Sequence, residues 1–501
     1  MRLPRAAGVL LHPTSLPGPH GSGDLGEDAF NFVDWLREAG QSYWQMLPLG
    51  GIGEGNSPYM SRSAFAGNEL LINLVELHRQ GWLGDADLEL ERNFGSRQID
   101  FPATIAFRFE WLRLAASRFS AGTDAGQRAQ FESFCETHSG WLDDYALFMT
   151  LADEFPGRDW CDWAPPLARR DPDALDAAAA EYREQIDFWK FCQWNFFRQW
   201  ETLRGHAHRQ GIRIIGDAPI FVAYHSAETW ARPELFELDD EGRQRVVAGV
   251  PPDYFSATGQ RWGNPLYRWE VHRQQGFSWW IERIRHSLKM VDILRIDHFV
   301  GFTRYWEIPV DEPTAERGEW RPAPGEALLE ALDAALGKVP IIAEDLGTVT
   351  PEVHALRRKF ELPGMCVLQF AWGHDGDENF LPHKHERDRV VYPGTHDNDT
   401  TRGWWKEAGE DIRQHLREYL ATDGRHICDD LIRCAMASVA DSAIITIQDW
   451  LGMGTEHRMN HPGKANNNWS WRLLWTDIDD ALAPRMAQQC RLYGRQRDSE
   501  T

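Results

Sequence analysis

The segments DILRIDHF (292–299) and PIIAEDLG (340–347) decide the fold class of this 501-residue chain. Each is a short apolar run, typical of a buried strand, that ends abruptly in charged residues. Six other segments have the same form, so eight strands are predicted in all. The other six are GVLLHP (8–13), YWQMLPL (43–49), IRIIGDAPIFV (212–222), MCVLQFAW (365–372), RVVYPGTHD (389–397) and AIITIQDWLG (443–452).

Polar side chains at the C-terminal end of every predicted strand favour an α/β barrel. Helical patterns lie between the later strands, such as residues 351–362, where Val353, Leu356 and Phe360 recur at helical spacing. Parallel strands that carry functional groups at their C-terminal ends are typical of a (β/α)₈ TIM-type barrel. A doubly wound open sheet, with two strands miscounted, is the alternative.

The spacing of the strands predicts large insertions in a single catalytic barrel domain that spans residues 1–501. A barrel of this type needs about 250 residues, so about half of the chain lies elsewhere. We expect a mainly helical subdomain at about 60–208, between strands two and three. A loop-rich, aromatic one is expected at about 223–276, between strands three and four, and a small one at about 302–338. One helix of the first insertion carries a stripe that is expected to be core: Ile186, Trp189, Gln193, Phe196 and Trp200.

Composition and charge exclude several classes of protein. With 42% hydrophobic residues and 24 tryptophans, the chain can bury a large core, which excludes disorder. The net charge of −23 would repel a phosphate backbone or an anionic lipid surface, so neither nucleic acid nor a membrane is an expected partner. No stretch approaches the ~18 apolar residues of a membrane span. Seven cysteines without C-x-x-C spacing indicate reduced thiols in a cytoplasmic protein.

Carboxylates at three strand ends are the candidate catalytic groups. Strand alternation places Arg295 and Asp297 on one face, where the guanidinium favours the ionised carboxylate that a nucleophile requires. Glu344 or Asp345 ends the next strand, and a glutamate in a partly apolar site can keep its proton and act as a general acid. A third carboxylate follows in the motif GTHDND (394–399).

These groups suit a reaction that passes through an oxocarbenium-like transition state. Such a reaction needs a proton on the leaving group and negative charge near the anomeric carbon, so glycosyl transfer is the chemistry inferred. A lone acid is more often a salt-bridged or solvated side chain, but three at barrel-strand ends favour function. Spacing alone does not choose Glu344 over Asp345, or Asp397 over Asp399.

Two loops rich in glycine and proline offer side chains that fit a sugar chain. Ring faces pack on the C–H surface of sugars, and amide groups bind their hydroxyls. The loop at 251–267 offers Tyr254, Phe255, Gln260, Trp262 and Asn264, and the loop at 54–68 offers Asn56, Ser57 and Tyr59. Structural packing is an equally good interpretation of these aromatic residues. The pair His383 and His385 has no third ligand nearby, so no metal site is expected.

With these motifs, the chain resembles the amylomaltases, the 4-α-glucanotransferases or disproportionating enzymes of glycoside hydrolase family 77. The resemblance covers nearly the whole chain in co-linear order, and the helical region before Gly211 bears the fewest motifs. It rests on GVLLHPTSLPG (8–18), WQMLPLG (44–50), GNSPYMSRSAFAGN (55–68), GDAPIFV (216–222), GVPPDYFSATGQRWGNPLY (249–267), LRIDHFVGF (294–302), IIAEDLG (341–347), GTHDNDT (394–400) and NWSWR (468–472).

The resemblance implies a role for each candidate residue. Asp297 would be the nucleophile that forms a covalent β-glycosyl intermediate, Glu344 the general acid and base, and Asp397 the stabiliser of the distorted sugar. The remaining positions would bind substrate: Asp217, Arg295, His298, Asp345 and His396 at the donor glucose, and Tyr59 and Trp262 at its neighbours.

The resemblance also implies a reaction and its partners. The family moves α-1,4-glucan segments from one malto-oligosaccharide to the 4-hydroxyl of another chain or of glucose. Malto-oligosaccharides, starch- or glycogen-type α-glucans and acceptor glucose are therefore the expected partners, without a cofactor, nucleotide sugar or metal. An α-glucan hydrolase of the same barrel superfamily and an inactive glucan-binding protein are the alternatives. One departure from the family pattern is Glu54, which stands where an aromatic residue is common.

Overall fold

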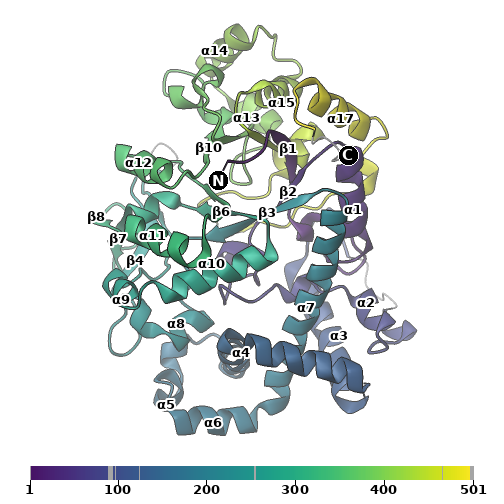
Figure 1. Ribbon diagram of the computed structural model, residues 1–501, viewed down its shortest axis with the longest axis vertical. Helices are drawn as coiled ribbons and strands as arrows, with labels where there is room; N and C mark the ends of the chain where they lie inside the picture. The colour runs from purple at the N-terminus through teal and green to yellow at the C-terminus, as the bar shows by residue number, and fades with distance from the viewer. Residues whose placement is uncertain are drawn as a thin grey trace.

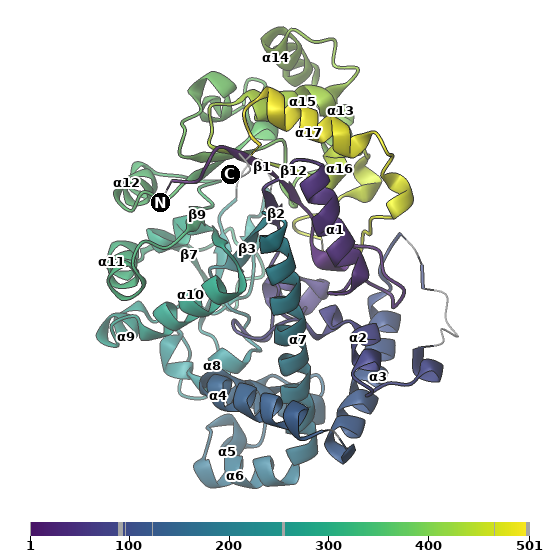
Figure 2. The same ribbon diagram turned by 45° about the vertical axis from the view of Figure 1, so that its right-hand side comes forward.

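The computed structural model describes residues 2–88, 94–95, 97–122, 124–252, 256–464 and 466–496. Its centre is a sheet of eight parallel strands in the order β10-β11-β12-β1-β2-β3-β6-β9 (Figures 1 and 2). The strands overlap all eight segments predicted from the sequence. They are β1 (Ala6–Leu10), β2 (Tyr43–Gln45), β3 (Arg213–Pro219), β6 (Ile293–Asp297), β9 (Ile341–Ala343), β10 (Gly364–Val367), β11 (Arg389–Tyr392) and β12 (Ser442–Thr446).

Hydrogen bonds between β9 and the start of β10 close the sheet into a barrel. The N–H of Ala343, at the end of β9, donates to the carbonyl of Pro363 at 2.8 Å. Beyond it, the N–H of Met365 in β10 donates to the carboxylate of Asp345 at 2.8 Å, so a side chain takes the place of the next backbone partner. The fold is therefore a (β/α)₈ barrel, as predicted, and the open sheet is excluded.

Helices cover the outside of the barrel. Between β10 and β11 the described chain forms only short 3₁₀ turns in place of a covering α-helix. None of the described helices is long and apolar enough to cross a bilayer. The covering helices are α1 (Glu27–Glu38) after β1, α7 (Arg183–Arg209) before β3, α10 (Ser278–Met290) before β6, α11 (Gly325–Leu336) after β6, α12 (Pro351–Lys359) after β9, α13 (Thr401–Glu407), α14 (Glu410–Leu420) and α15 (Ile427–Ala437) after β11, and α16 (Ile447–Trp450) and α17 (Leu482–Leu492) after β12.

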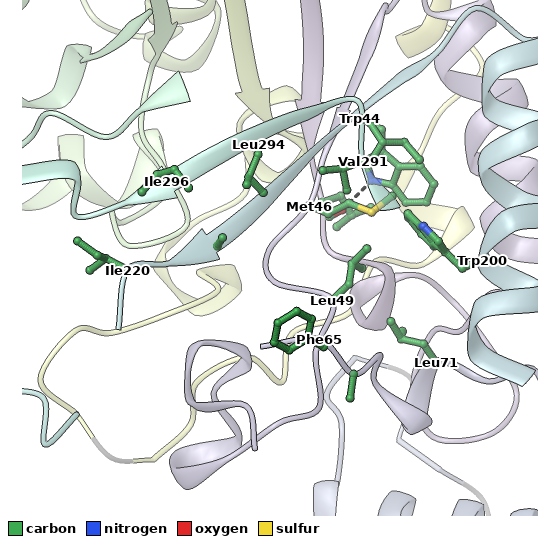
Figure 3. Close-up of a cluster of buried hydrophobic side chains, with 14 of the residues drawn as sticks. Trp44, Met46, Leu49, Phe65, Leu71, Trp200, Ile220, Val291, Leu294 and Ile296 are labelled. Atoms are coloured by element: carbon green, nitrogen blue, oxygen red, sulfur yellow. Dashed lines mark hydrogen bonds between the residues drawn. The ribbon is translucent and has the colours of Figure 1, made fainter. Parts of the chain in front are cut away.

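Two layers of apolar side chains hold the barrel together. Every strand contributes to an inner cluster, for example Leu10 and Ile342, and because the strands share only the barrel interior, this cluster fills it. A larger cluster packs the outward faces against the helices. Figure 3 shows part of it, where Trp44 of β2 lies beside Trp200 of α7. The indole of Trp44 donates to the carbonyl of Leu11 at 2.7 Å, so the buried ring carries no unpaired N–H.

The connection from β2 to β3 is mainly helical. Its helices are α2 (Leu74–Arg79), α3 (Phe101–Gly122), α4 (Ala125–Glu154), α5 (Pro165–Ala168), α6 (Pro172–Glu181) and the first part of α7. The predicted stripe on α7 is buried throughout, and α4 packs against this helix. At 27 residues, α7 is about 40 Å long, so one continuous helix joins the inserted helices to the barrel. The division of the chain into inserted subdomains stays a prediction.

A second sheet lies in two of the expected insertions, the loop-rich one at 223–276 and the small one at 302–338. It is antiparallel in the order β5-β4-β7-β8 and stands beside α9 (Trp269–Gln274) and α11 (Figure 1). The connection from β3 to β6 contributes β4 (Val246–Val250) and β5 (Gln260–Arg261), and also contains α8 (Ala227–Ala231). The connection from β6 to β9 contributes β7 (Arg304–Pro309) and β8 (Glu319–Pro322). These two connections are therefore paired with each other rather than independent loops.

Candidate active site

A cavity of about 790 Å³ opens at the C-terminal ends of the barrel strands. This volume lies in the upper part of the range for small-molecule sites, so it has room for more than one sugar ring. Asp217 and His396 lie one layer behind the cavity wall, and Asp345 lies apart from it. Seven of the ten residues predicted from the sequence line the cavity: Tyr59, Trp262, Arg295, Asp297, His298, Glu344 and Asp397.

Arg295 joins two aspartates at the ends of neighbouring strands. Its Nη1 lies 2.8 and 2.6 Å from the two carboxylate oxygens of Asp217 on β3. The same nitrogen lies 3.0 Å from Oδ1 of Asp297, as the alternation of β6 predicted. The side chain of Asp217 is 0% exposed, whereas that of Asp297 is 29% exposed. Arg295 therefore holds Asp297 at the cavity surface, and the buried carboxylate of Asp217 holds Arg295 in place.

Burial raises the pKa of Asp297 to about 6. The charge of Arg295 lowers the pKa, as expected from the sequence, but this effect is smaller than that of burial. The charges of Asp217 and Asp397 raise the pKa further. Asp297 is therefore mainly ionised at neutral pH, although it protonates more readily than an ordinary aspartate.

The surroundings of Glu344 favour its protonated form. Burial raises the pKa of Glu344 well above its ordinary value, and the charge of Asp297 adds to this rise, while Arg295 opposes it. Oε2 of Glu344 accepts the backbone N–H of His298 at 2.6 Å, which leaves Oε1 to carry the proton. Burial and the charge of Asp297 thus both favour the protonated form of Glu344.

A left-handed backbone at His298 shapes this contact. The φ angle of His298 is 52°, a conformation that is uncommon for residues other than glycine and that collects at functional sites. It turns the chain sharply at the end of β6, so the N–H of Phe299 also donates to the carbonyl of Glu344, at 3.1 Å. Burial lowers the pKa of the His298 ring to about 4. Its Nε2 has no protein partner within the described chain, so a neutral imidazole remains available to a ligand.

Tyr59 connects the Asp217 layer to Asp397. Its hydroxyl donates to Oδ2 of Asp217 at 2.8 Å and lies 2.8 Å from Nε2 of His396. Since the hydroxyl proton points to Asp217, the oxygen accepts from the N–H of His396. Nε2 of His396 also lies 3.3 Å from Asp397. Burial alone would raise the pKa of Asp397, but the charge of His396 and hydrogen bonds outweigh it and hold the pKa below the ordinary value.

Asn460 is a site residue that the sequence reasoning missed. Its Nδ2 donates to Oδ1 of Asp397 at 2.6 Å. Arg458 supports the pair, because its Nη2 donates to the carbonyl of Asp397 at 3.0 Å and its Nε donates to the carbonyl of Asn460 at 2.7 Å. A polar residue in the Gly/Pro loop that precedes the quoted motif at 468–472 was the available signal.

The structure does not bring Asp345 to the cavity. Its carboxylate accepts from Met365 N at 2.8 Å and from Arg389 Nη1 at 2.6 Å, and it lies 3.4 Å from Nε of Arg357. Successive residues of an extended segment point to opposite faces. Glu344 therefore faces the cavity while Asp345 faces the neighbouring strand.

The aromatic loop reaches the cavity through Trp262. Its ring meets the ring of His298 edge to face, with centroids 4.9 Å apart, and its Nε1 donates to the side chain of Gln260 at 3.1 Å. Both Gln260 and Trp262 line the cavity. Tyr254 and Phe255, which the sequence also suggested, lie outside the described residues.

Comparisons with known sequences identify the family. The sequence profile of the family described as 4-alpha-glucanotransferase matches residues 11–477. A 4-alpha-glucanotransferase of Thermus thermophilus is 50% identical over 495 residues, which cover 97% of this chain and 98% of the relative. The chloroplastic/amyloplastic 4-alpha-glucanotransferase of Solanum tuberosum is 43% identical over 501 residues, which cover 98% of this chain and 86% of the relative.

Solved structures agree with this result. An amylomaltase of Streptococcus agalactiae in complex with acarbose matches with a TM-score of 0.95 at 35% identity, covering 98% of this chain and 100% of that one. An amylomaltase of Corynebacterium glutamicum shares the fold, with a TM-score of 0.79 at 19% identity over 99% of this chain and 75% of that one. The chain therefore belongs to the amylomaltases, the 4-alpha-glucanotransferases of glycoside hydrolase family 77.

Proposed function

We propose that this 4-α-glucanotransferase moves α-1,4-glucan segments from a donor malto-oligosaccharide to the 4-hydroxyl of an acceptor glucan or of glucose by a retaining double displacement. The observation that carries the proposal is that Asp297, Glu344 and Asp397 line one cavity with different affinities for a proton. An ionised nucleophile, a protonated acid and a further ionised carboxylate are what a retaining transfer requires.

In the first displacement, Asp297 attacks the anomeric carbon of the donor sugar. The bond from this carbon to the glycosidic oxygen breaks, and Glu344 gives its proton to that oxygen, so the shortened glucan leaves as an alcohol. Arg295 keeps the attacking carboxylate aimed at the cavity. Asp397, held by His396 and Asn460, supplies negative charge beside the developing oxocarbenium ion.

In the second displacement, the acceptor replaces the leaving chain. Glu344, now ionised, takes the proton of the acceptor 4-hydroxyl. The oxygen of this hydroxyl attacks the anomeric carbon, and the ester bond from that carbon to Asp297 breaks. One α-1,4 bond is broken and one is made, so the reaction needs no nucleotide sugar, cofactor or metal to drive it. Water in place of the acceptor would give hydrolysis.

The proposed substrate contacts follow from which side chains line the cavity. We assign direct contacts to Tyr59, Trp262, Arg295 and His298, which line the cavity. Asp217 and His396 act through the side chains that they hold. The carboxylate of Asp345 contacts groups of β10 and of the elements that lie beside β10. We therefore propose that it helps to close the barrel and does not bind the donor sugar.

Malto-oligosaccharides and larger α-glucans are the substrates, and the names of the relatives support this class. Glucose as an acceptor, the lack of nucleic-acid and membrane partners and a cytoplasmic location belong to the same proposal. The net charge of −23 and seven free cysteines support it.

We expect a bell-shaped dependence of kcat/KM on pH. The nucleophile works only when ionised, so activity is lost as the pH falls through the pKa of Asp297 at about 6. The acid works only when protonated, so activity is also lost as the pH rises through the raised pKa of Glu344. Initial rates with maltotriose, measured between about pH 4 and pH 10, record the loss of activity on both the acid and the alkaline side. This range begins near the ordinary pKa of a carboxyl group.

The variant Asp217→Asn tests the cause of the loss of activity at low pH, the acid limb of the pH profile. It removes a negative charge that raises the pKa of Asp297, so the acid limb should move to lower pH even though the rate also falls. An acid limb that keeps its position in this variant would contradict the electrostatic explanation.

Incubation with maltotriose alone tests the reaction. Transfer predicts glucose together with a ladder of chains longer than maltotriose. Glucose and maltose without longer chains would support the α-glucan hydrolase, and unchanged maltotriose would support an inactive binding protein. Products are resolved by chain length at several early times.

A further inference from the structure

Trp320 is a tryptophan of the cavity wall that core packing does not explain. It lies on β8 and lines the same cavity as the three carboxylates. Trp306, its register partner on β7, packs against a small apolar cluster that includes Val247 and Ile308, and its Nε1 donates to the carbonyl of Ala315 at 3.0 Å. Trp320 packs against none of the apolar clusters formed by the described residues.

Protein contacts fix one side of the Trp320 ring. The guanidinium carbon of Arg304 lies 4.2 Å from the ring centroid, and the ring of Trp306 meets it edge to face with centroids 5.3 Å apart. Arg304 also donates to the carbonyl of Thr348 at 3.3 Å. The ring is thus held in place while part of its surface is left to the cavity, as in a preorganised binding platform.

Trp320 shares its part of the wall with Glu344. Leu346, Gly347 and Thr348, which follow Glu344 along the chain, also line the cavity, and Arg304 ties Thr348 to the Trp320 ring. The group that protonates the glycosidic oxygen faces the leaving chain, and the acceptor later takes the place of that chain. The wall beyond Glu344 is therefore on the acceptor side of the cleaved bond.

We propose that Trp320 forms an acceptor-side subsite that stacks on a glucose unit remote from the cleaved bond. The inference rests on the proposed function and adds a determinant of acceptor length to it. The C–H face of a glucose unit and a planar indole remove apolar surface from water when they stack. A single glucose acceptor binds next to Glu344 and does not extend to Trp320, whereas a longer chain does.

The test compares acceptors of different length with one donor. α-Maltotriosyl fluoride serves as the donor, and glucose, maltose and maltotetraose serve as acceptors. In Trp320→Ala, the ratio of kcat/KM for maltotetraose to kcat/KM for glucose should fall about fivefold to tenfold, the effect of losing one stacking contact. The fall should lie in the KM for the acceptor, and Trp320→Phe, which keeps a ring, should recover most of it.

Trp405→Ala is the matched control. This half-buried tryptophan on α13 lies beneath Arg413 and Arg417 and is outside the cavity lining, so its loss also removes a ring stacked on arginine. The length ratio should stay at the wild-type value in this variant. A binding measurement in the Asp297→Asn background gives a second readout. Adding Trp320→Ala there should weaken maltoheptaose binding about fivefold to tenfold.

Each outcome separates this inference from the proposed function. If the wild-type protein yields no transfer product with any acceptor, the proposed function fails. If it transfers normally and Trp320→Ala keeps the wild-type length ratio and maltoheptaose affinity, the subsite is refuted. A rise in the KM for the donor that is equal for every acceptor would place Trp320 on the donor side and also refute it.

Discussion

Replacing Asp297 with asparagine is expected to lower kcat for glucan transfer by at least about 10⁴-fold. The amide keeps the size of the side chain but cannot form the glycosyl ester, so the double displacement has no first step. The fold should persist, because Asp217 still pairs with Arg295 through both carboxylate oxygens. Initial rates with maltotriose and a thermal unfolding curve measure the two effects separately.

Asp292→Asn is the matched control for this variant. Asp292 directly precedes β6, and its carboxylate accepts from Arg204, His208 and the N–H of Ile214 rather than facing the cavity. Its loss should lower thermal stability and change kcat by less than about threefold. Full transfer activity in Asp297→Asn would overturn the assignment of the nucleophile.

Replacing Glu344 with glutamine is expected to lower kcat with a malto-oligosaccharide donor by about 10³- to 10⁴-fold. Glutamine has no proton to give to the glycosidic oxygen. An α-maltotriosyl fluoride donor should restore much of the first step, because fluoride departs without a proton. Release of fluoride in a rapid first phase, equal to the amount of enzyme, is the quantity to measure.

The neighbouring residue provides the control for Glu344. Asp345→Asn removes a carboxylate that pairs with Arg389 and accepts from the N–H of Met365, so it should lower the thermal stability of the barrel. It should affect maltotriose and the fluoride donor to the same degree. If Glu344→Gln lowers the rate with maltotriose and with the fluoride donor to the same degree, another group supplies the proton.

The barrel was predictable because each of its strands is a local signal. An apolar run such as Ile293–Asp297 is buried on both faces and ends in polar residues, so a single segment identifies both the strand and its functional end. The second sheet gave no such signal. β5 has two residues and β8 has four, and the pairing of β4 with β7 joins residues far apart in the sequence.

Part of the candidate site was predictable from direction along a strand. Alternation placed Arg295 beside Asp297, and their separation of 3.0 Å confirms this prediction. The same rule explains why Glu344 reaches the cavity and Asp345 does not, but the sequence did not reveal which face was inward. Asn460 and Trp320 could not be found in this way, because loops and a small sheet bring them to the wall.

The pKa values were predictable in part. The sequence indicated a proton on a glutamate and an ionised aspartate beside an arginine. The pKa of Glu344 is raised, the direction expected for an acid, whereas the pKa of Asp297 is also raised, opposite to the direction expected beside Arg295. The sequence did not indicate that burial outweighs Arg295 and raises the pKa of Asp297. That balance depends on how many charged groups share one buried cluster, which spacing along the chain does not give.

Trapping the glycosyl-enzyme tests the central claim most directly. The Glu344→Gln variant is mixed with α-maltotriosyl fluoride, quenched, digested and analysed by mass spectrometry. The first displacement needs no acid with this donor and the second lacks its base, so the intermediate should accumulate. We predict that the peptide containing Asp297 carries one maltotriosyl group. Fluoride release without a labelled peptide, or a label on another residue, would contradict the mechanism.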